Sequence, residues 1–175
     1  LNEQLVAVGS VRDVRVGDVR ADGSIAGAVT QVGGAALSRQ TQQASLVGSV
    51  TATDAGNVRA IGTLNGAITQ LQAAGASGGN AQLIAIGSSR NLAANDVRMQ
   101  GAVNGELIQI SANVGTVLNQ QVTNVGGAAN ATAANLRTTG TVNGVVTQIA
   151  AAALSGFNAQ ELVVGGVQGA TVNQD

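Results

Sequence analysis

The chain has 175 residues, eight Lys or Arg residues against nine Asp or Glu residues, a formal net charge of −1, and neither Cys nor His. Without Cys and His there are no disulfides, no zinc sites of the usual kind, no cysteine nucleophiles and no His-based catalytic triads. Because nucleic-acid binders carry a basic face and usually aromatic platforms, a near-neutral chain whose single aromatic residue is Phe157 argues against that class. No apolar run approaches the ~18 residues of a membrane helix and no charged leader region precedes Leu1, so we expect neither membrane insertion nor a signal peptide in this segment.

Apolar residues at even spacing predict short strands in the first part of the chain, at about 4–8, 11–16, 19–25 and 28–32. Val19, Ile25 and Val29 differ by even steps, which places them on one face of an extended chain. Gly23 and Gly27 share that parity, and they mark turns or a close approach of two backbones. The segment rich in small residues after the last strand predicts a corner, and so do its copies; these segments are 33–40, 73–79, 112–118 and 151–157.

These elements recur with a period of 39 residues and without a single insertion. A motif that runs from Val-Arg through two Gly residues to a Gln starts at Val19, Val58 and Val97 and, with Leu in place of Val, at Leu136. We therefore expect one repeat domain over residues 1–175, with repeats at 2–40, 41–79, 80–118 and 119–157 and a partial repeat at 158–175.

A gapless repeat indicates that equivalent residues lie directly above one another. The sequence predicts an all-β protein, a β-solenoid or cross-β-like stack in which one repeat forms one rung of parallel, in-register strands ~4.8 Å from the next. The Ala-rich segment 149–154 is the best helical candidate, so an α/β solenoid with one short helix per repeat is the alternative. Its copy at 71–75 contains Gly, which disfavours a helix.

Stacking turns each repeated position into a column along the axis. Two columns consist of Gln alone, and their amides can donate to one rung and accept from the other as a polar zipper. The simpler interpretation is a row of solvated Gln side chains. The first column is Gln31, Gln70, Gln109 and Gln148, and the second is Gln4, Gln43, Gln82, Gln121 and Gln160. A third column of Gly follows an aliphatic residue at Gly9, Gly48, Gly87, Gly126 and Gly165.

A fourth column carries positive charge, at Arg20, Arg59, Arg98 and Arg137. Like charges stacked ~5 Å apart repel each other. The column two positions earlier offers acceptors, at Asp18, Asn57, Asp96 and Asn135. We expect Asp18 to share a face with Arg20 and to offset its charge locally. The functional alternative is a stripe that binds anions or a polysaccharide.

The acidic residues form no paired carboxylates of the kind that general acid–base catalysis needs. Five of them occur once each in their columns: Asp13, Asp22, Asp54, Glu106 and Glu161. We expect no enzyme activity, no catalytic residues, no cofactor and no metal. An ice-binding solenoid would need a Thr column, which Ile108 interrupts.

Several blocks resemble bacterial functional-amyloid fibre subunits of the Fap or curli type. They are Asn80-Ala81-Gln82, Asn119-Gln120-Gln121, Asn158-Ala159-Gln160 and the Val-Asn-Gly-x-x-x-Gln blocks that start at Val103 and Val142. Curli-type repeats are shorter and carry Ser and aromatic residues that are missing here, so the composition is more similar to the Fap type. The resemblance lies in the style of the repeat over all 175 residues rather than in one diagnostic motif.

The resemblance implies a structural subunit of a self-assembling extracellular fibre that supports a biofilm matrix or surface attachment. The implied partner is the chain itself in a homopolymeric filament stacked end to end, with a secretion or nucleator protein as a further candidate. The implied location is extracellular, at the cell surface or in the biofilm matrix. Both terminal repeats obey the consensus, so neither end is capped. The competing hypothesis is a β-solenoid stalk or adhesin segment of a longer secreted protein.

Overall fold

The computed structural model describes residues 2–38, 40–169 and 171–172. Every regular element in that part of the chain is a β-strand, and nearly all strand pairing joins residue i to residue i+39 in parallel. Val19, for example, pairs with Val58, which pairs with Val97. The prediction of an all-β solenoid with one 39-residue repeat per rung is therefore confirmed.

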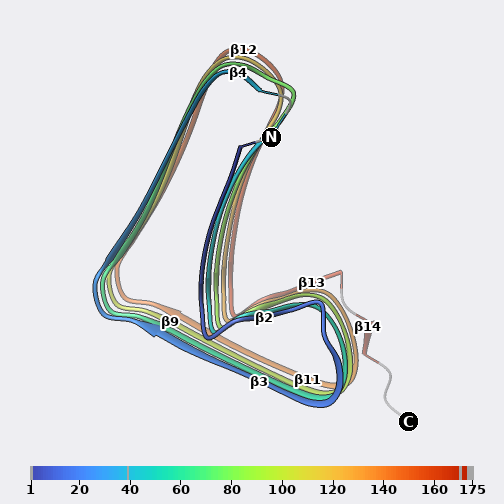
Figure 1. Ribbon diagram of the computed structural model, residues 1–175. Coiled ribbons are helices and arrows are strands. Elements are labelled where there is room, and N and C mark those ends of the chain that lie inside the picture. The colour runs from blue at the N-terminus through green and yellow to red at the C-terminus, as the bar shows by residue number, and fades with distance from the viewer. Residues whose placement is uncertain (1, 39, 170, 173–175) are drawn as a thin grey trace.

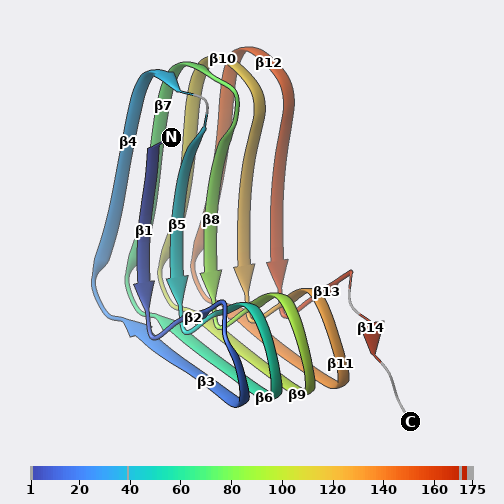
Figure 2. The same ribbon diagram turned by 45° about the vertical axis from the view of Figure 1, so that its right-hand side comes forward.

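Each rung traces the same path, and the rungs stack along one axis (Figures 1 and 2). The first rung contains β1 (Asn2–Val8), β2 (Val11–Arg12), β3 (Arg15–Ile25) and β4 (Ala28–Ser38). The second contains β5 (Thr41–Val47), β6 (Val50–Leu64) and β7 (Ala67–Ser77). Next come β8 (Asn80–Ile86), β9 (Ser89–Val103), β10 (Glu106–Val125) and β11 (Ala128–Val142). The last are β12 (Val145–Val164), β13 (Val167–Gln168) and β14 (Thr171–Val172).

The view in Figure 1 shows two lobes in cross-section. In the long lobe, one wall is made by β1, β5, β8 and the second half of β10, and the facing wall by β4, β7 and the first half of β10. Strands β10 and β12 curve around its tip (Figure 2). In the short lobe, β2 and β13 face β3, and β6, β9 and β11 form both walls as they bend.

The two lobes meet at a waist where two stretches of backbone touch. The Gly column there has φ between +55° and +63°, a conformation that L-residues rarely adopt. A Cβ added to Gly48 would overlap the carbonyl oxygen of Ile61, and one added to Gly62 would overlap the carbonyl oxygen of Val47. Only glycine on both sides allows this approach.

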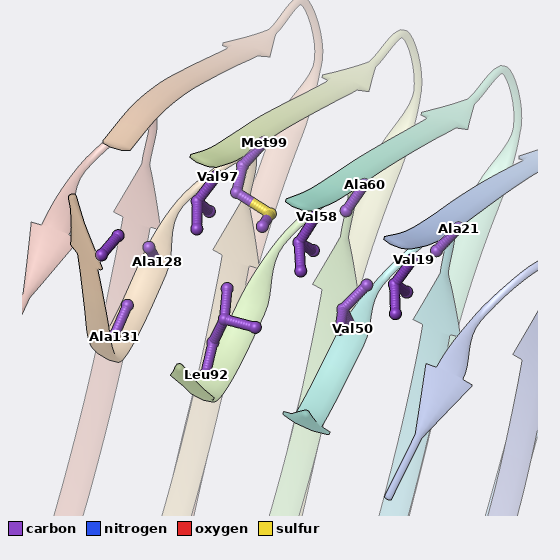
Figure 3. Packing of buried hydrophobic residues seen from close by; sticks show 11 residues of the cluster. Val19, Ala21, Val50, Val58, Ala60, Leu92, Val97, Met99, Ala128 and Ala131 are labelled. Carbon is purple, nitrogen blue, oxygen red and sulfur yellow. The ribbon is translucent and has the colours of Figure 1, made fainter. Parts of the chain in front are cut away.

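The waist divides the interior into two apolar cores. The short-lobe core contains Val19, Val58, Val97 and Met99 (Figure 3), and the long-lobe core contains Leu64, Ile68, Ile84, Ile86 and Leu107 next to the waist. Each core is a stack of columns that most rungs fill with apolar residues, such as Val19, Val58 and Val97 in one column of the short lobe. Hydrophobic burial therefore repeats along the axis and depends on the neighbouring rungs.

The predicted corners at 33–40 and its copies lie where the chain curves around the tip of the long lobe, but the strands are not confined to the segments before them (Figure 2). Strands β4 and β7 continue to Ser38 and Ser77, and β10 and β12 run through the curve for 20 residues each. Small residues let the backbone bend, but the parallel hydrogen bonds to the next rung continue around the bend. The same pairing excludes the helical alternative, because residues 149–154 lie within β12.

Candidate functional site

The Gln31 column forms a continuous ladder of side-chain amides inside the long lobe. The Nε2 atom of Gln70 donates to Oε1 of Gln31 at 2.8 Å, Gln109 donates to Gln70 at 3.0 Å, and Gln148 donates to Gln109 at 2.9 Å. Gln70 and Gln109 have no exposed surface. Their full burial excludes the interpretation of solvated Gln side chains for the inner rungs.

The second column forms a parallel ladder on the facing wall. Gln43 donates to Gln4 at 2.8 Å, Gln82 to Gln43 at 3.0 Å, Gln121 to Gln82 at 2.7 Å and Gln160 to Gln121 at 2.8 Å. In both ladders Nε2 donates toward the N-terminal rung and Oε1 accepts from the C-terminal rung. The ladders therefore have a direction along the axis.

Each ladder also joins the two walls of the long lobe. Gln70 Nε2 donates across the interior to the carbonyl of Leu83 at 3.0 Å, and Gln43 Nε2 donates in the opposite direction to the carbonyl of Leu71 at 2.9 Å. The hydroxyl of Ser45 adds a bond to Oε1 of Gln31 at 2.9 Å. Sequence reasoning missed these bonds, because the period aligns equivalent residues but does not show which walls face each other.

The Arg column is in register and lies on the outer surface of the short lobe. Arg20 pairs with Arg59, which pairs with Arg98, which pairs with Arg137. Asp18 lies on the same exposed face, as expected, but it is not the carboxylate that binds Arg20. Arg20 instead binds Asp22 at 3.3 Å, and Asp18 accepts a hydrogen bond from Asn57 at 2.7 Å. The amide of Asn57 is a neutral neighbour in the same column, so it reaches Asp18 along the axis.

Asn side chains form further ladders on the surface. Asn104 donates to Asn65 at 2.9 Å and Asn143 to Asn104 at 3.1 Å, at the turn that carries the Asn-Gly pairs. At the β2–β3 bend, Asn130 donates to Asn91 at 3.2 Å. The repeated Asn in the sequence was the signal that could have predicted these ladders.

Both ends of the stack expose positions that are buried in the inner rungs. Leu162 is 49% exposed in the last rung, whereas Ile84 in the same column is fully buried. At the first rung, β1, β3 and β4 pair on one side only, with β5, β6 and β7. Oε1 of Gln148 and Oε1 of Gln160 accept no hydrogen bond within the described part of the chain. These two ends are the surfaces best suited to bind another β-edge.

Other kinds of site are not found in the described residues. They contain no group of three or more acidic side chains placed to hold a metal ion. Within the same ranges, no helix has the length and apolar character needed to cross a bilayer. Comparison of the chain with protein-family models, with curated proteins and with solved structures finds no match.

Proposed function

We propose that this chain is a structural subunit of a self-assembling extracellular bacterial fibre, which serves a biofilm matrix or surface attachment. The observation that carries the proposal is the pair of complementary open ends. The first and last rungs present the same columns as the inner rungs, uncovered, so a second copy in register would set its β1 on the second half of β12 and its β2 on β13. The last rung holds no counterpart of residues 20–38, so a tilted or interlocked junction would have to cover β3 and β4 of that copy.

The direction of the Gln ladders supports head-to-tail growth. In the first rung, Gln4 and Gln31 donate to the carbonyls of Val32 and Ala44 and keep one N–H each for a rung below. In the last rung, Gln148 and Gln160 keep an acceptor oxygen for a rung above. The Gln4 donor at one end then meets the Gln160 acceptor at the other when copies stack in register, whereas head-to-head contact would place donors against donors.

The apolar surface at the two ends supports the same contact. Leu162 and Val164 at the last rung are 49% and 41% exposed, and Leu5 at the first rung is 45% exposed. Covering such side chains contributes about 25 cal/mol per Å² of apolar surface. Stacking would therefore add both backbone hydrogen bonds and hydrophobic burial.

The test is a pair of variants in the last rung. Leu162→Lys places a charge in a column that a second copy would have to bury, whereas Val145→Lys places the same charge in an exposed column that already contains Glu106. We expect the parent chain and Val145→Lys to form unbranched filaments with the ~4.8 Å reflection of stacked strands in fibre diffraction. Leu162→Lys should stay monomeric with an unchanged circular dichroism spectrum.

Two results would contradict the proposal. A parent chain that stays monomeric at high concentration, with a folded solenoid, would favour the stalk or adhesin segment of a longer secreted protein. Filaments that form equally well from Leu162→Lys would show that the ends of the solenoid do not mediate assembly.

A further inference from the structure

A groove runs along the solenoid axis on the outside of the short lobe. Its volume is about 780 Å³, and the Arg column forms one side of it and the Asp18 column the other. Between them lies the backbone of the Val19 column, whose side chains point into the short-lobe core (Figure 3). The groove is therefore built from strands β3, β6, β9 and β11, which are held in register by their own hydrogen bonds.

The positive charge of this groove is left without a partner in most rungs. Asp22 binds Arg20, but the equivalent positions in the other rungs are Ile61, Gln100 and Thr139. Within the described residues, no ion pair involves Arg59, Arg98 or Arg137. Even the Arg20 pair is weak, because the two side chains are 67% and 53% exposed. Stacked guanidinium groups repel each other, and an anion between them would remove that repulsion.

The opposite side of the groove offers groups that suit hydroxyls. Asn57 donates to Asp18 and Asn135 donates to Asp96, both at 2.7 Å, so carboxylate and amide alternate along the axis. Carboxylates accept hydrogen bonds from hydroxyl groups. Amides both donate and accept. The groove thus has a cationic side and a hydrogen-bonding side.

We propose that this groove binds a linear acidic polysaccharide whose chain runs parallel to the solenoid axis. Sugar carboxylates lie against the Arg column, where guanidinium groups make bidentate contacts, and sugar hydroxyls lie against the Asp18 column. The rungs repeat every ~4.8 Å, so one sugar residue spans about one rung. The inference does not depend on assembly, because the whole groove lies within one chain.

A nucleic acid fits the groove less well. Grooves that bind single-stranded nucleic acid combine positive charge with aromatic side chains on which the bases stack. The residues that line this groove include no aromatic side chain, and two of them are Asp. The lining therefore favours an anionic chain that carries hydroxyls over one that carries bases.

The test measures binding of a fluorescently labelled oligogalacturonate by fluorescence anisotropy at low and high salt. Arg59→Gln with Arg98→Gln removes two charges from the groove, and Arg12→Gln with Arg90→Gln removes two charges elsewhere. We expect the groove variant to lose roughly tenfold or more in affinity and the control less than about twofold. Asp96→Asn keeps the shape of the groove and removes a negative charge, so it should bind the probe more tightly. A neutral cello-oligosaccharide should not compete.

Several outcomes would overturn the proposal. They are absence of binding to the parent chain, equal losses in the two double variants, weaker binding by Asp96→Asn, and tighter binding of a DNA strand with the same number of charges. If the groove variant misfolds by circular dichroism, Asp96→Asn and the DNA comparison still decide the question. A parent chain that forms filaments but does not bind the probe would reject this inference alone and leave the proposed function in place.

Discussion

Gly48 lies at the waist, where its φ is +55° and the carbonyl of Ile61 occupies the space of a side chain. We predict that Gly48→Ala lowers the free energy of unfolding by roughly 3 kcal/mol or more, because the left-handed conformation costs an L-residue and the Cβ would overlap backbone. The matched control is Gly17→Ala, because a Cβ there meets no atom within 4 Å. Urea unfolding of both variants measures the difference, and equal stability would contradict the described waist.

Ala52 has φ of 51° at the β2–β3 bend, in the column of Asp13, Asn91 and Asn130. Asn tolerates this conformation better than Ala, and the other Asn residues of the column already bond to each other along the axis. We predict that Ala52→Asn raises the free energy of unfolding by about 0.5–1 kcal/mol. The control is Ala93→Asn, in β9. Because φ is not positive at Ala93, this substitution should not raise the free energy of unfolding. A stabilisation of both variants would refute the backbone explanation.

At the scale of the strands, the Gln ladders hold the two walls of the long lobe together. We predict that Gln70→Leu lowers the free energy of unfolding by about 1–3 kcal/mol, because Gln109 loses its acceptor and the carbonyl of Leu83 loses its donor. The double variant with Gln109→Leu should lose about 1 kcal/mol less than the two single losses together, because the shared bond is removed once.

The control for this double-mutant cycle is Gln42→Leu, an exposed position in the facing wall, which we expect to change stability by less than about 0.5 kcal/mol. Strictly additive losses for Gln70 and Gln109 would mean that the ladder bond contributes nothing. A further readout is assembly, since the double variant should form filaments more slowly than the parent if the ladders continue between copies.

For the whole molecule, stability is shared between neighbouring rungs. The strands of an inner rung, such as β8, pair on both sides, with β5 and β10, whereas β1 pairs only with β5. We predict that backbone amides of β8 exchange with solvent far more slowly than those of β1 and β14. Hydrogen exchange measured by NMR or mass spectrometry tests this. Uniform protection in the monomer would contradict it, and β1 should become protected only when filaments form.

The Gln and Arg columns could be derived from the sequence because a gapless period allows one alignment of the rungs. Once Val19 lies above Val58, Gln31 must lie above Gln70, and a buried amide in a column finds its partner in the next rung. Strand alternation, rather than the period, placed Asp18 on the face of Arg20. Alternation puts Asp22 on that face equally, so it could not decide which of the two carboxylates Arg20 binds.

The sequence by itself determined the period, the register and the strand content of this protein, because these follow from local alternation and from the spacing of identical residues. Only the tertiary structure decided the path of one rung: the waist at Gly48 and Ile61, the two lobes, the curved tip of β10 and the wall that each Gln reaches. That path depends on contacts between residues far apart within a rung, and the bends at small residues leave the direction of the chain undetermined until both cores are packed.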